Sequence, residues 1–157
     1  MATARPARLY RAEIAHTPGA LAAALAPFAT AGSDLQVVMA YRSPGGHTRA
    51  VVEVYPVEGR KLEAAAAAAG FAPMAAPMLV VEGRNRPGRG ERIAAALAGA
   101  GINVQYLVAQ VVGRRYSAVF GFETEDDAKA AALVITNKAW KARAAPRTIK
   151  STKTTRR

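Results

Sequence analysis

The chain has 157 residues, 51% of them hydrophobic, a length typical of one domain or of two half-size units that share a sheet. It contains no cysteine, which excludes disulfide bonds, thiolate catalysis and cysteine-ligated zinc. The formal net charge is +11, and the segment after Trp140 contributes seven basic residues and no acidic ones.

The first half of the chain predicts secondary structure in the order β-α-β-β-α-β. In residues 8–15 apolar and charged residues alternate, which indicates a half-buried strand. Thr17 is a favourable N-cap, Pro18 suits the first helical position, and apolar residues then recur at helical spacing up to Gly32. The remaining expected elements are strands at 35–42, 49–55 and 71–76 and a helix at 58–69.

The second half predicts a similar order and follows without an obvious linker. The expected elements are strands at 78–82, 103–112 and 116–123, and helices at 90–98 and from 125 to about 137 or 140. The segment 124–127 has capping-box spacing, with acidic residues where the helix dipole favours them. No clear fourth strand follows this half, and residues 148–150 are the only candidate for it.

The two halves are related by an internal repeat at a fixed offset of 69 residues. The matching pairs are Pro18-Gly19 with Pro87-Gly88, Gly32 with Gly101, and 34–37 with 103–106. A repeat fixes the architecture before any single residue does. Two copies of this length predict two similar small modules in tandem.

Polar residues near the Pro-Gly turns are candidates for ligand binding. A glycine at a helix start lets a ligand approach free N–H groups, which favour a carboxylate or phosphate. Asn85 precedes the second turn and Asn103 begins the next strand. We expect these ends to lie beside each other, so that two amides bind the ammonium and carboxylate of an amino acid. The equivalents in the first repeat are His16 and Asp34. Ordinary turn chemistry is the alternative for Asn103 and Asp34, and an exposed loop histidine is the alternative for His16.

The segment 85–88 (Asn-Arg-Pro-Gly), followed by 100–104 (Ala-Gly-Ile-Asn-Val), resembles the signature of ACT domains, which are small amino-acid-sensing regulatory modules. Residues 8–137 together resemble the stand-alone tandem ACT proteins of bacteria. The resemblance implies an α+β fold of two ferredoxin-like (βαββαβ) ACT units with antiparallel sheets and helices on one face. The expected boundaries are 1–76 for the first unit, 77–140 for the second, and 141–157 for a basic disordered tail.

The resemblance also implies a small amino acid held where two ACT units meet, by the Pro-Gly loop and the next strand. The ligand-binding residues carried over are Asn85, Arg86, Pro87, Gly88 and Asn103 in the second repeat and His16, Gly19 and Asp34 in the first. Gly83 stands where some family members have a histidine, so one expected contact is absent from the second repeat. Asp34 in place of asparagine would disfavour a ligand carboxylate in the first repeat. The first repeat is therefore expected to be a degenerate, structural copy.

The sequence favours binding over catalysis. Neither histidine has a serine or aspartate at triad spacing, the acidic residues 125–127 fit a helix start, and no phosphate-binding P-loop motif occurs. We expect no enzyme activity, cofactor or metal. The expected protein is a cytoplasmic regulator, whose amino-acid effector shifts a homodimer, or an enzyme partner supplied in trans, between two arrangements.

Nucleic-acid binding is the alternative function. Ferredoxin-like sheets also build RNA-recognition domains, and residues 114–122 have a faint likeness to their strand motif. However, Tyr116, Phe120 and Phe122 share a face that a helix-covered core would also use. The basic tail 141–157 offers a second, purely electrostatic route to nucleic acid. We expect no membrane partner, because no targeting segment precedes the first strand and the apolar run 64–69 is too short to span a bilayer.

Overall fold

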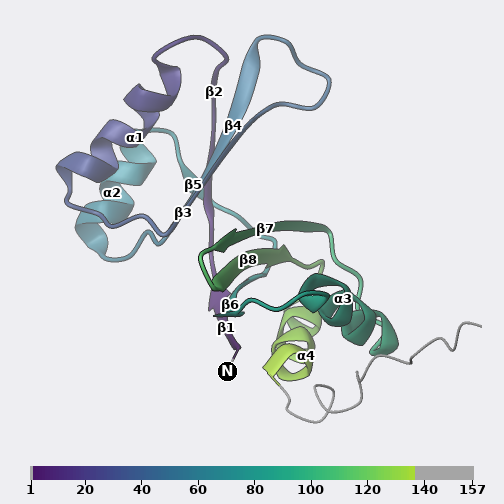
Figure 1. The fold of residues 1–157 in the computed structure, drawn as a ribbon. Helices are drawn as coiled ribbons and strands as arrows, with labels where there is room; N and C mark the ends of the chain where they lie inside the picture. Colours follow the sequence, from purple (N-terminus) through teal and green to yellow (C-terminus); the bar gives the residue numbers. More distant parts are fainter. Residues whose placement is uncertain (1, 137–157) are drawn as a thin grey trace, which may run out of the picture.

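The computed structural model describes residues 2–136, which form two units, each a four-stranded antiparallel sheet with two helices on one face (Figure 1). The α+β, doubled ferredoxin-like architecture predicted from the sequence is confirmed. The predicted end of the last helix, the candidate strand at 148–150 and the tail 141–157 lie outside the described residues. None of the helices within 2–136 is long and apolar enough to cross a bilayer.

The first unit contains the sheet β3-β4-β2-β5. Its elements are β2 (Tyr10–Ala15), α1 (Ala20–Thr30), β3 (Val37–Arg42), β4 (Arg49–Tyr55), α2 (Arg60–Ala68) and β5 (Ala72–Pro73). Alternate residues of β2 and β4 face α1 and α2, where Phe28 and Phe71 pack edge to face with ring centroids 5.0 Å apart. The core around these rings places both helices on one side of the sheet.

The second unit contains the sheet β1-β6-β8-β7. Its elements are β1 (Thr3–Ala7), β6 (Met78–Arg84), α3 (Arg89–Gly99), β7 (Tyr106–Val112), β8 (Arg115–Gly121) and α4 (Glu125–Thr136). Thr124 caps α4, because its hydroxyl accepts the Asp127 N–H at 3.0 Å, as the capping-box spacing predicts.

The fourth strand of the second sheet comes from the start of the chain. β1 pairs antiparallel with β6, from Thr3 opposite Glu82 to Ala7 opposite Met78. Residues 3–7 therefore belong spatially to the second unit, although the expected boundary at residue 76 grouped them with the first. Backbone pairing decides this placement: β1 satisfies the hydrogen-bonding groups along the open edge of β6. The first unit is thus inserted between two neighbouring strands of the second.

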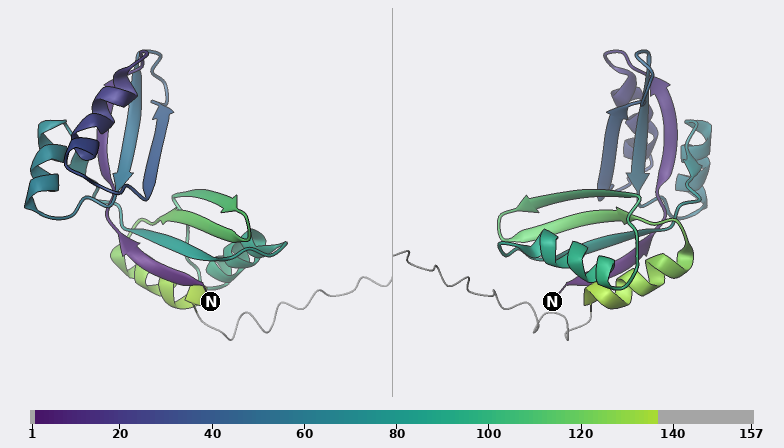
Figure 2. Two further views of the ribbon diagram at one scale, coloured as in Figure 1. Left: turned by 60° about the vertical axis from the view of Figure 1, so that its left-hand side comes forward. Right: turned by 90° about the vertical axis from the view of Figure 1, so that its right-hand side faces the viewer.

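The two sheets meet through the faces that carry no helices. Leu9, Met78, Val80 and Val119 form the buried centre of this junction. Figure 2 shows the helices of the second unit on the side of their sheet that is turned away from the first unit. Beside this junction the Met74 N–H donates to the Leu9 carbonyl at 2.8 Å.

A buried carboxylate, Glu53, lies on the same helix-free face of the first sheet. The Tyr41 hydroxyl donates to its Oε1 at 3.0 Å, and the Arg11 guanidinium lies 3.9 Å away. Tyr106 of the second unit is close enough that burial and then the Glu53 charge raise the pKa of its hydroxyl. Buried polar groups therefore lie beside the apolar junction of the two sheets.

Candidate functional site

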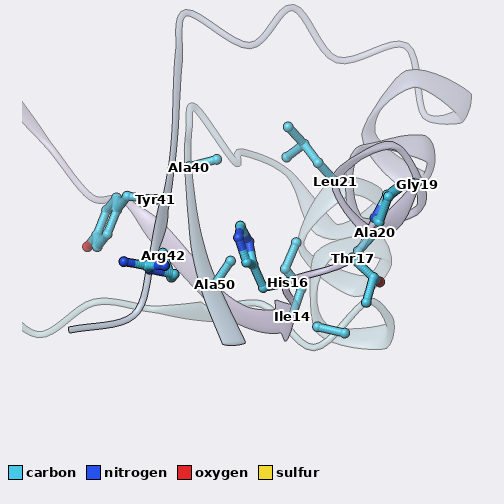
Figure 3. Close-up of a pocket in the computed structure, with 12 residues that line it drawn as sticks. Ile14, His16, Thr17, Gly19, Ala20, Leu21, Ala40, Tyr41, Arg42 and Ala50 are labelled. Carbon is cyan, nitrogen blue, oxygen red and sulfur yellow. The ribbon is translucent and has the colours of Figure 1, made fainter. Parts of the chain in front are cut away.

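A cavity of about 560 Å³ opens at one corner of the first unit (Figure 3). It is formed by the end of β2, the β2–α1 turn with His16 and Gly19, the first turn of α1, and the end of β3. This volume is within the range of small-molecule sites. The corner therefore has the size that a metabolite requires.

The cavity combines apolar walls with a few groups suited to an anion. Ile14, Leu21 and Ala40 supply apolar surface, and Leu21 is 41% exposed although it is a large hydrophobic side chain. In Figure 3 the His16 ring projects between the Arg42 side of the cavity and the first turn of α1. Arg42 and the helix N-terminus both contribute positive potential here.

The backbone of the turn makes the helix N-terminus accessible. Gly19 is the N-cap of α1 at φ 86°, a left-handed conformation that favours glycine. No atom of the described residues 2–136 lies within 4 Å of the position that a Cβ would occupy on it. At this turn the Ala20 N–H donates to the Thr17 carbonyl at 3.2 Å, and the N–H groups of the next two residues of α1 have no intrahelical acceptor. A carboxylate placed here would gain hydrogen bonds together with the favourable helix dipole.

The second unit repeats this backbone corner closely. Gly88 is the N-cap of α3 at φ 74°, and its carbonyl accepts the Arg92 N–H at 3.1 Å, as Gly19 accepts the Ala23 N–H at 3.0 Å. The residues before the turns also correspond: Asn85 N–H donates to Arg114 and His16 N–H to Thr48, at 2.8 and 2.9 Å. The predicted equivalence of the two Pro-Gly corners therefore extends to their hydrogen bonds.

Side chains make the two corners different. Gly83, Arg89 and Tyr116 stand where the first unit has Ile14, Ala20 and Ala50, as the repeat offset and the strand pairing show. The Tyr116 ring lies so close to Gly83 that a Cβ there would be 2.9 Å from its Cε1. The Arg89 guanidinium lies 5.7 Å from the centroid of the same ring.

The second corner is consequently filled by its own residues. The first repeat, which matches the ACT signature less well, contains the open cavity. In the second repeat, which matches it better, Tyr116 and Arg89 occupy the equivalent space. The signature identifies the backbone turn. Side chains of the neighbouring strands determine whether a cavity is open at that turn. The open cavity of the first unit gives no support to the expectation that the first repeat is the degenerate copy.

Asn85 and Asn103 do not lie beside each other, and neither do His16 and Asp34. Asn85 follows Arg84, which pairs with Arg115 at one end of the second sheet. Asn103 lies near Gln105, whose N–H donates to the Gly121 carbonyl at the other end of that sheet. The expected adjacency is wrong because a β-α-β crossover makes its two strands parallel. The end of one strand and the start of the next then lie at opposite ends, roughly 20 Å apart.

Asp34 faces a separate hollow. It lines a cavity of about 540 Å³ with Gly32, Glu58 and Lys61, at the far end of the first unit from His16. All eight residues predicted for the site are solvent-exposed: His16, Gly19, Asp34, Asn85, Arg86, Pro87, Gly88 and Asn103. Of these, only His16 and Gly19 line the cavity in Figure 3. The prediction missed Arg42 and Leu21, which the alternation of β3 and the spacing of α1 could have placed there.

The aromatic residues of β8 are unavailable to nucleic-acid bases. Tyr116 and Phe120 are 7% and 4% exposed and Phe122 is fully buried, all within the core covered by α3 and α4. Base stacking on this strand, which the RNA-recognition alternative requires, is therefore contradicted. Within residues 2–136, no group of three His, Asp or Glu side chains could hold a metal ion.

Similarity to known proteins is found in structure and not in sequence. No family model matches the chain, and no curated protein matches it. The protein BT0572 from Bacteroides thetaiotaomicron has a similar structure, with a TM-score of 0.69 at 14% identity over 82% of this chain and 87% of that one.

Two regulatory subunits of aspartate kinase share the fold as well. The subunit from Thermus thermophilus, in its ligand-free form, gives a TM-score of 0.59 at 16% identity over 85% of this chain and 93% of its own. The subunit from Thermus flavus gives 0.52 at 17% identity over 85% and 94%. The chain therefore has the fold of two ACT units in tandem, as the resemblance implied.

Proposed function

We propose that the chain is a regulatory binding protein and that the cavity of its first unit holds a small amino acid. The observation that carries this proposal is the open corner between α1 and β3, on the fold that regulatory subunits of aspartate kinase use. A site made of a turn, a helix N-terminus and an arginine offers binding groups. It offers no nucleophile paired with a base, so the proposal is binding without catalysis.

The cavity suits the zwitterion of an amino acid with an aliphatic side chain. The carboxylate would lie at the N-terminus of α1, near Gly19 and the Arg42 guanidinium. An unprotonated ring nitrogen of His16 would accept a hydrogen bond from the ammonium. The apolar side chain would pack against Leu21 and Ala40, which keeps apolar surface out of water.

Regulation would follow from the position of β3 at the edge of its sheet. Within the described residues β3 pairs only with β4, and Val38 and Tyr41 are 44% and 43% exposed on it. We propose that a second copy of the chain covers this edge, closing the cavity, and that the cytoplasmic homodimer acts on an enzyme in trans. A ligand that binds one arrangement more tightly then shifts the population toward it.

A thermal unfolding screen against the common amino acids tests the proposal. A ligand present at a hundred times its Kd stabilises the folded state by about 2.7 kcal/mol, which corresponds to a rise in Tm of several degrees. Ala40→Phe would fill the cavity from an exposed position and should abolish the rise. Ala109→Phe, at the repeat-equivalent exposed position of β7, is the matched control and should retain it.

The regulatory part is tested separately by sedimentation with and without the stabilising amino acid. A ligand-dependent change in the oligomer is expected for the wild type and for Ala109→Phe. A protein that no amino acid stabilises would contradict the sensor. A protein that is stabilised without any change in sedimentation would contradict only the dimer.

A further inference from the structure

The second corner carries a concentration of arginines that the first corner lacks. They come from the end of β6, the β6–α3 turn and the start of α3: Arg84, Arg86, Arg89 and Arg92. The residues 69 positions earlier, on the equivalent backbone, are Ala15, Thr17, Ala20 and Ala23. The two corners share one geometry, but only one of them has acquired four positive charges.

The β7–β8 turn adds two more arginines beside this corner. Arg115 pairs with Arg84 across the sheet, and the Arg114 carbonyl accepts the Asn85 N–H at 2.8 Å. Within residues 2–136 none of the six arginines has a carboxylate oxygen within 4.0 Å: the nearby Glu82 pairs with Arg5 at 3.2 Å, and Glu91 in the first turn of α3 forms no ion pair with them. Gathering like charges is unfavourable without a counter-charge.

Two buried polar atoms at this corner have no hydrogen-bond partner among the described residues. They are the Tyr116 hydroxyl and Arg89 Nε. Tyr116 is only 7% exposed, and its hydroxyl lies 3.2 Å from the Cβ position of Gly83, under the first turn of α3. Burial raises the pKa of this hydroxyl and the Arg89 charge lowers it in part, so it remains a donor at neutral pH. Unpaired buried donors of this kind are uncommon in folded proteins.

We propose that the arginine-rich surface of this second corner binds a phosphate group at the N-terminus of α3, with Arg89 and the Tyr116 hydroxyl, which fill the corner, as the floor of the site and the surrounding arginines as its rim. A single carboxylate would use one or two guanidinium groups. A phosphate has more acceptor oxygens and more charge, and its geometry fits the planar arginine fork. The Arg92 guanidinium lies over this turn, because it donates to the Pro87 carbonyl at 3.2 Å and its Nη1 is 3.4 Å from the Cβ position of Gly88.

The phosphate can belong to a free small molecule or to a polynucleotide backbone, which present the same group. The proposal uses only residues of the second unit, so it does not depend on amino-acid binding in the first. It also differs from electrostatic binding through the tail 141–157, which needs no structured corner. Variants of the full-length chain separate these cases.

The test measures binding of pyrophosphate and ATP by calorimetry, and of a short oligothymidylate by fluorescence anisotropy, at low salt. One variant replaces Arg84, Arg86, Arg89 and Arg92 by glutamine. The matched control loses the same charge from the tail: Lys150, Lys153, Arg156 and Arg157 to glutamine. We expect at least a hundredfold loss of affinity in the corner variant and about threefold or less in the control.

Two single substitutions guard against a corner variant that fails to fold. Tyr116→Phe removes only the hydroxyl, and Arg86→Gln removes one exposed cation. Each should weaken phosphate binding about tenfold and leave the Tm unchanged within a few degrees.

The outcomes separate cleanly. Binding of pyrophosphate or ATP that the corner variant loses supports the proposal, with a free phosphate compound as the source. Binding of the oligonucleotide alone, lost in the same variant, supports it with a polynucleotide as the source. The proposal is overturned if no probe binds, if the tail control loses as much as the corner variant, or if both single variants bind as the wild type does.

Discussion

The contact between Gly83 and Tyr116 gives a prediction in which one substitution changes sign with its background. Gly83 lies in the extended strand β6 and has no positive φ, so an alanine there meets no backbone strain. In the wild type its Cβ would lie 2.9 Å from Tyr116 Cε1 and 3.2 Å from the hydroxyl. The ring is buried and lies under Arg89, so the backbone or the ring must shift.

The expected magnitudes follow from packing. Overfilling a core by one methyl group typically costs about 1–3 kcal/mol, so Gly83→Ala should lower the free energy of unfolding by that amount. In the Tyr116→Ala background the obstructing ring is absent. There Gly83→Ala should raise stability by about 0.5–1 kcal/mol, because glycine is unfavourable inside a strand. The coupling between the two positions should then be about 1.5–4 kcal/mol.

Urea unfolding of the four proteins in this double-mutant cycle measures the coupling directly. The slope of the free energy against urea should be the same in all four, so that midpoints report stability alone. If Gly83→Ala had the same sign and size in both backgrounds, the Tyr116 ring would not fill the second corner. The contrast drawn between the two units would then fail.

Three further outcomes are expected. Deleting residues 2–7 removes β1 and leaves the edge of β6 unpaired, so its backbone amides should exchange hydrogen much faster, as mass spectrometry would detect. Phe28→Ala, at a side chain 1% exposed, should cost about 3–5 kcal/mol in urea unfolding, whereas Leu133→Ala, at 72% exposure, should cost under about 0.5. Because burial raises the pKa of Tyr106, stability should be level below about pH 9 and fall above about pH 10, where only the unfolded phenol ionises. Tyr106→Phe should make that fall shallower, and an equally steep fall in this variant would assign it to other groups.

Local patterns in the sequence predicted most of the fold. Alternation in residues 8–15, the Pro-Gly turns and the 69-residue offset were enough to place the helices of both units and every strand except 3–7. The strand 3–7 was missed because its contacts lie more than seventy residues away. Its composition, with a proline and only partly buried alanines, carries no strand signal of its own.

The candidate site was harder to predict than the fold. Turn chemistry is local, so the two corners were recognised from their Pro-Gly dipeptides. Whether a corner is open depends on side chains from other strands, here Ala50 in one unit and Tyr116 in the other. The expected pairing of Asn85 with Asn103 failed for a topological reason: the predicted β-α-β order makes the two strands parallel, so that the end of one strand and the start of the next lie at opposite ends of the sheet.

The insertion of the first unit between β1 and β6 also has a consequence for folding. Before either unit forms, pairing Ala7 with Met78 would require closing the whole loop of residues 8–77. Once the first unit has folded, the Met74 N–H holds the Leu9 carbonyl at 2.8 Å, and only a few residues separate β1 from β6 on each side. The entropy cost of pairing β1 with β6 then falls by about 2 kcal/mol. Folding of the first unit therefore brings together two strands of the second sheet.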